Sequence, residues 1–78
     1  MSKSGNLFED VVACSGLASW IAPGTVIRSL NTVGIKSPAA AHPDDYRRAI
    51  PQLKARMAMY LTVSEVEFHI QQIEALLR

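Results

Sequence analysis

Residues 62–77, TVSEVEFHIQQIEALL, hold the clearest structural signal in the chain. Thr62 followed three residues later by Glu65 has the form of a capping box, in which each side chain accepts a hydrogen bond from the other residue's backbone N–H. Apolar side chains then recur at steps of three and four, the period of one helical face; they are Val63, Val66, Ile70, Ile73 and Leu77. We therefore predict a final helix that turns this stripe inward.

Glycine and proline divide the rest of the chain into short segments with the same helical period. One helix is predicted over residues 7–15, with Asn6 as its N-cap and Gly16 as its stop. A second is predicted from about residue 23 to residue 33, and Gly34 lies just beyond its end.

Two prolines shape the prediction for the middle of the chain. Pro43 suits the first position of a helix, and Asp44 and Asp45 follow it in the turn where the helix dipole favours anions. A proline inside a helix clashes with the carbonyl four residues earlier and donates no hydrogen bond. We therefore expect Pro51 to end this helix and to open another, whose inward stripe includes Tyr60.

The predicted fold class is all-α, because no segment sustains the period-two alternation of a half-buried strand. With 78 residues the chain can close only one core. We expect a compact bundle of five or six short helices, forming a single domain over residues 6–78 after a flexible segment at residues 1–5.

Composition excludes several classes of protein. Eight Lys and Arg residues against seven Asp and Glu residues lack the strongly basic balance of a dedicated nucleic-acid binder. A hydrophobic content of 49% excludes a disordered acidic tail. A single cysteine and the absence of an apolar run of about 18 residues predict a cytoplasmic protein without a membrane partner.

Catalytic chemistry has little support in the sequence. Cys14, His42 and His69 are widely separated, and no Cys or His pair has the spacing of metal ligands. We predict a protein that is not an enzyme and has no catalytic residues, metal site or cofactor. A role as an accessory subunit that completes an enzyme's fold stays open.

Charge segregation suggests a partner surface instead. A basic group in the middle of the chain precedes an acidic final helix; the residues are Arg47, Arg48, Lys54 and Arg56, then Glu65, Glu67 and Glu74. Our hypothesis is an interaction module, similar in size to small adaptor folds of the death-domain or sterile-alpha-motif kind, that docks on another protein or on copies of itself. Because the two groups differ, such contacts could extend into rings or filaments. Alternatively, the two segments pair within one molecule.

Two aromatic residues could anchor such a contact. Phe68 lies nearly opposite the apolar stripe of the final helix, and Trp20 lies in residues 17–22, which fit either a helix or a loop. Each side chain is either covered by its own bundle or exposed to a partner, for which Trp is a favoured anchor.

DNA binding is the alternative function. The segment TVIRSLN (residues 25–31) follows DV at residues 10–11 and GL at residues 16–17, and this pattern resembles the helix-turn-helix of lac-repressor-type regulators. The resemblance covers about the first 30 residues, with a connection longer than the usual turn of about 3–4 residues. It implies DNA contacts from Thr25, Arg28 and Asn31.

Overall fold

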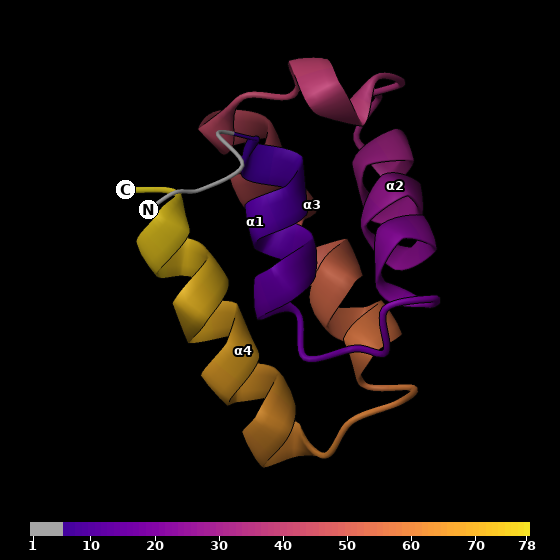
Figure 1. Ribbon diagram of the computed structural model, residues 1–78, viewed down its shortest axis with the longest axis vertical. Coiled ribbons are helices and arrows are strands. Elements are labelled where there is room, and N and C mark those ends of the chain that lie inside the picture. The colour runs from indigo at the N-terminus through magenta and orange to yellow at the C-terminus, as the bar shows by residue number, and fades with distance from the viewer. Residues whose placement is uncertain (1–5) are drawn as a thin grey trace.

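The computed structural model describes residues 6–78 as an all-helical fold (Figure 1). Over this range the chain forms four α-helices and one short 3-10 helix, without strands. In chain order these are α1 (Leu7–Cys14), α2 (Ala22–Thr32), η1 (Pro38–Ala40), α3 (Pro43–Met57) and α4 (Val63–Leu76). The predicted flexible segment, residues 1–5, lies outside the described residues.

The prediction of five or six helices is wrong, and Pro51 is the reason. α3 continues through Pro51 without a break. A proline in a helix interior costs about 3 kcal/mol, so packing must compensate for it. Tyr46 and Ala49 before the proline, and Leu53 and Met57 after it, are all buried in one core, whereas Pro51 itself is exposed. Both halves of α3 are thereby held on the same core.

Three predicted helix boundaries are confirmed by their local geometry: the Asn6 cap, the Gly16 stop and the Thr62–Glu65 capping box. The Asn6 side chain accepts from the Phe8 N–H at 2.9 Å, and Gly16 follows α1 with a φ of +75°, which an L side chain rarely adopts. At the start of α4, Glu65 Oε1 accepts from the Thr62 N–H at 2.9 Å, and Thr62 Oγ1 accepts from the Glu65 N–H at 3.2 Å. Of residues 17–22, which fitted either a helix or a loop, residues 17–21 lie in the connection before α2 and only Ala22 belongs to that helix.

Side chains from all four α-helices build one core; its members are Val11, Val26, Leu30, Tyr46, Ala49, Leu53, Met57, Val66, Ile70, Ile73 and Leu77. Two residues predicted to point inward are exposed instead, Val63 at 73% and Tyr60 at 54%. Val63 is the first residue of α4, and Tyr60 lies in the turn beyond the end of α3. Neither therefore lies where the helical stripe meets the core.

The two flanks of α4 are packed differently. On one flank α4 lies against α1 (Figure 1). There the ring of His69 approaches Gly16 so closely that a Cβ atom on the glycine would lie 2.3 Å from Nε2. On the other flank α4 returns antiparallel to α3 after the turn at residues 58–62. The candidate site lies along this second flank.

Candidate functional site

A hollow of about 290 Å³ lies between the C-terminal half of α3 and the start of α4. Its apolar lining consists of Ala55, Ala58, Val63 and Val66. Lys54 stands on the α3 side and Glu67 on the α4 side. Neither charge forms an ion pair with another of residues 6–78.

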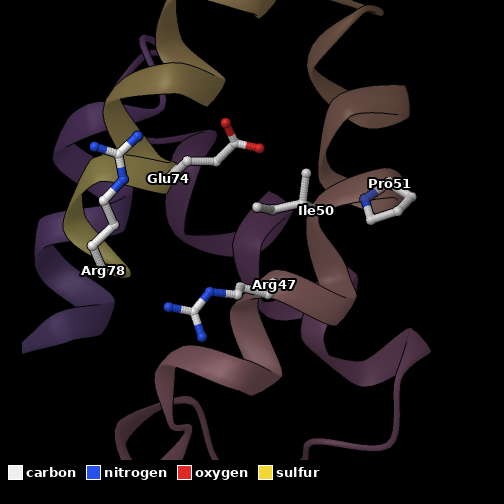
Figure 2. A pocket seen from close by; sticks show the side chains of 5 residues that line it. All are labelled: Arg47, Ile50, Pro51, Glu74 and Arg78. Atoms are coloured by element: carbon white, nitrogen blue, oxygen red, sulfur yellow. The ribbon is translucent and has the colours of Figure 1, made fainter.

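A second hollow, of about 450 Å³, lies between the same two helices toward the start of α3. Its lining consists of Arg47, Ile50, Pro51, Glu74 and Arg78. Figure 2 shows Arg47 and Ile50 reaching from α3, and Glu74 reaching from α4, into the space between the helices.

The two hollows lie along the same pair of helices, and we refer to them together as the α3–α4 groove. Arg47 and Lys54 are seven residues apart on α3, and Glu67 and Glu74 are seven apart on α4. Seven residues are close to two helical turns, so the members of each pair share a face of their helix. The groove therefore has cations on its α3 side and an apolar floor, while its α4 side has Glu67 and Glu74, with Arg78 adding a positive charge just beyond the end of α4.

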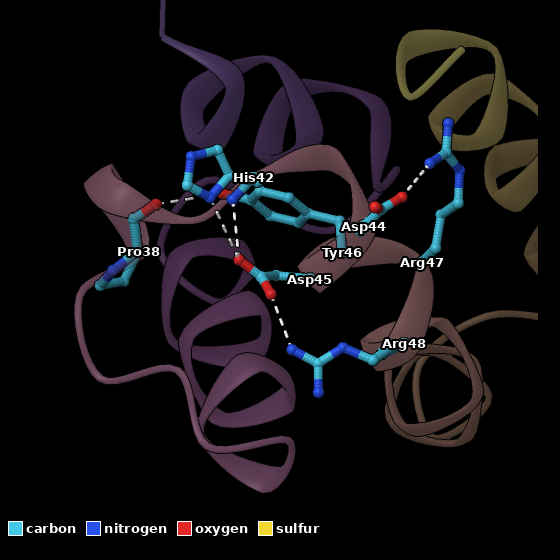
Figure 3. Close-up of polar contacts among 7 residues, drawn as sticks. All are labelled: Pro38, His42, Asp44, Asp45, Tyr46, Arg47 and Arg48. Atoms are coloured by element: carbon cyan, nitrogen blue, oxygen red, sulfur yellow. Dashed lines mark hydrogen bonds and ion pairs between the residues drawn. The ribbon is translucent and has the colours of Figure 1, made fainter.

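The arginines at the start of α3 are already engaged by their own helix (Figure 3). Arg47 Nη1 donates to Asp44 Oδ1, and Arg48 Nη2 donates to Asp45 Oδ1 at 2.7 Å. These partners are aspartates three residues earlier and not the glutamates of α4. Arg47 Nη2 also donates to the carbonyl oxygen of Leu77, which ties the end of α4 to α3.

The start of α3 is a structural cap. Asp45 Oδ2 accepts from the backbone N–H of His42 at 2.9 Å, and this bond, with that from Arg48, lowers the pKa of the Asp45 carboxyl. The Tyr46 hydroxyl donates to the carbonyl of Pro38 at 3.3 Å, and burial raises its pKa to about 12. These contacts fix η1 against α3 (Figure 3).

Three other predicted docking residues lie away from the groove lining. Arg48 is paired as described, and Glu65 caps α4, where the Thr62 N–H lowers its pKa. Arg56 is two residues from Lys54, which places it nearly opposite on the helix. It is half-buried, and its Nε has no hydrogen-bond partner in residues 6–78.

Both predicted aromatic anchors are exposed, Trp20 at 83% and Phe68 at 57%. Trp20 also lines a third hollow, of about 210 Å³, between the α1–α2 connection, the first two turns of α2 and the α3–α4 connection. Its lining residues are Trp20, Ile21, Gly24, Thr25, Arg28 and Tyr60. Sequence reasoning missed Tyr60 here because it placed this residue on a buried stripe.

The residues of the predicted DNA contact differ in accessibility. Arg28 and Asn31 are exposed and lie one turn apart on α2. Thr25 is only 7% exposed, and its hydroxyl donates to the carbonyl of Ile21 at 3.1 Å. In this structure the threonine supports the first turn of α2.

The groove floor is a further feature that sequence reasoning missed. Ala55 follows Lys54 on α3, Ala58 is the first residue after that helix, and both are exposed. The sequence does show two small side chains one and four residues after Lys54. This spacing indicates a groove floor only once it is known which face of α3 lies toward α4.

Nucleophilic and metal chemistry gain no candidate from the geometry. Burial, together with the charge of Asp10, raises the pKa of the Cys14 thiol and disfavours the reactive thiolate. No group of three or more His, Cys, Asp and Glu residues within positions 6–78 is arranged to hold a metal ion. Within the same part of the chain, no helix has both the length and the apolar character to cross a membrane.

Comparisons with protein families, with curated proteins and with solved structures found no match to this chain.

Proposed function

We propose that this chain is an assembly module in which two copies dock face to face through the α3–α4 groove. One observation carries the proposal: an apolar floor lies between an unpaired cation, Lys54, and an unpaired anion, Glu67, in the same hollow. Such a surface is complementary to itself. A second copy supplies both charges in the required places.

A two-fold axis parallel to the helices satisfies this complementarity. Because Lys54 and Glu67 line the same hollow, they lie at the same level along the antiparallel pair. Rotation about such an axis lays α3 of one copy over α4 of the other and keeps that level. Lys54 of each copy then faces Glu67 of the other, and the opposed helices complete a four-helix arrangement.

The apolar floor supplies the driving force, and the charges set register and encounter rate. Val63 is 73% exposed and contributes apolar area that docking removes from water. Rim charges contribute more to specificity and association rate than to affinity. Since both charges lie on one face, the proposed contact is isologous and closes as a dimer, in place of rings or filaments.

Charge reversal with complementation tests the proposal. In sedimentation equilibrium we expect Lys54→Glu and Glu67→Lys each to weaken self-association by at least about tenfold, because each homodimer then opposes like charges twice. A mixture of the two variants should form a dimer, since both contacts are attractive again. The double variant, with Lys54→Glu and Glu67→Lys in one chain, should also regain self-association.

The matched control for Lys54→Glu is Lys36→Glu, which changes the net charge by the same amount at an exposed position between α2 and η1. It should dimerise like the parent chain. Arg47→Glu is unsuitable as a docking test because Arg47 also holds the end of α4. A parent chain that stays monomeric at all protein and salt concentrations, or variants that fail to complement, would overturn the proposal.

Duplex DNA binding through Arg28 and Asn31 is the second candidate, supported by their exposure on one face of α2. It predicts an electrophoretic shift that weakens steeply with salt and is reduced by Arg28→Ala. Absence of a shift at low salt would remove it. A non-enzymatic role and a cytoplasmic location stay predictions from the sequence.

A further inference from the structure

The hollow between the two connections combines aromatic faces with unused donors. Trp20 comes from the α1–α2 connection and Tyr60 from the α3–α4 connection, and both line the hollow while largely exposed to solvent. The Trp20 indole N–H and the Tyr60 phenol O–H form no hydrogen bond with residues 6–78. A Cβ on Gly24 would meet nothing within 4 Å, so this side of the hollow is open.

This combination matches the chemistry of a polyproline II segment. Such a segment has no internal hydrogen bonds, so its carbonyl oxygens are free to accept from indole and phenol donors. Its prolyl rings pack on aromatic faces, and because the segment is already extended it loses little entropy on binding. A hollow of about 210 Å³ is small, which suits individual prolyl rings better than a folded helix.

The one charged residue in the lining determines which charge the ligand should carry. Arg28 is exposed and forms no ion pair with residues 6–78. It favours a carboxylate beside the prolines. Within this hollow a single cation is too little to bind a single-stranded nucleic acid, whose backbone is held along a positively charged groove.

We propose that the Trp20–Tyr60 hollow binds a proline-rich segment of a partner protein that carries an acidic residue next to its prolines. This surface is distinct from the α3–α4 groove, so the inference does not depend on self-association.

Fluorescence offers a direct test because Trp20 is the only tryptophan in the chain. An oligoproline peptide ending in glutamates should shift the Trp20 emission to the blue and saturate with concentration. Oligoalanine ending in glutamates and oligoproline ending in lysines serve as matched probes, and each should bind more weakly. Tyr60→Ala and Arg28→Glu should weaken the titration by about tenfold.

Anisotropy of the labelled peptide extends the test to Trp20→Ala, with Phe68→Ala as the control. Both residues are exposed aromatics, but Phe68 does not line the hollow. We expect Trp20→Ala to abolish binding and Phe68→Ala to leave it intact. Equal losses from the two variants, no saturable binding of oligoproline, or a stronger response to single-stranded oligothymidine would overturn the proposal.

Discussion

The two flanks of α4 show opposite uses of small side chains. Toward α1, Gly16 has no side chain, so the ring of His69 can lie directly on its backbone. Toward α3, Ala55 and Ala58 are also small, but hollows remain between the helices. The closed flank has no room for an added side chain, and the open flank includes two charges, Lys54 and Glu67, that form no ion pair with residues 6–78. A helix that packs closely on one side can thus leave hollows on the other.

The closed flank gives the largest predicted effect. Gly16→Ala places a Cβ on a residue with φ of +75° and within 2.3 Å of the His69 ring. The left-handed backbone costs about 1–2 kcal/mol for an L residue, and the ring must also move. We expect unfolding free energy to fall by at least about 2 kcal/mol, measured by chemical denaturation.

Gly24→Ala is the matched control for that change. Gly24 lies inside α2, and a Cβ there meets no atom within 4 Å. Because alanine is the better helix former, the control should stabilise by up to about 1 kcal/mol. Equal destabilisation by both variants would mean that the Gly16–His69 contact does not close this flank.

The next effect tests the end of the open flank where α3 holds α4. Arg47→Ala removes the bond to the Leu77 carbonyl as well as the pair with Asp44. A hydrogen bond to a charged donor contributes about 1.5–3 kcal/mol, and partial exposure lowers this, so we expect a loss of about 1–2 kcal/mol in thermal melts. Arg48→Ala removes only an exposed pair and should cost less than about 0.5 kcal/mol. Similar losses would show that the Leu77 bond contributes nothing.

In the middle of the open flank, a substitution should affect assembly without affecting the stability of the single chain. Lys54 is exposed and unpaired, so Lys54→Ala should change the unfolding free energy by less than about 0.5 kcal/mol in dilute solution. At high concentration the parent chain should gain stability through dimerisation, because association stabilises the folded state by mass action. The Lys54→Ala melting temperature should depend less on concentration. Identical concentration dependence would argue against docking through this flank.

Local features of the fold were predictable from sequence, and relations between helices were not. Asn6, Gly16 and the Thr62–Glu65 box act within one turn of chain, so residue type alone identifies them. Pro51 failed as a helix end because the core on both sides of it outweighs its local penalty.

The same division holds for the candidate site. The sequence identified Lys54 and Glu67 as members of opposite charge groups, but their meeting at one hollow depends on how α3 and α4 pack. Arg47 and Arg48 were grouped with Lys54, although the aspartates three residues before each arginine already offered partners on the same helix face. That spacing was visible in the sequence and would have separated paired from unpaired charges.

Acid sensitivity is the smallest predicted effect, and it concerns the starts of the two helices that line the groove. Backbone N–H groups lower the pKa of Asp45 in α3 and of Glu65 in α4. A carboxyl with a lower pKa in the folded state stabilises the fold above its unfolded pKa, and this contribution is lost as pH falls through the folded value. Melting temperature should therefore begin to fall near pH 4 and continue to fall below it. Asp45→Asn and Glu65→Gln should each flatten this decline, and the double variant should flatten it further. If the melting temperatures of these variants fall with pH as steeply as that of the parent chain, the caps add nothing to the stability of the open flank.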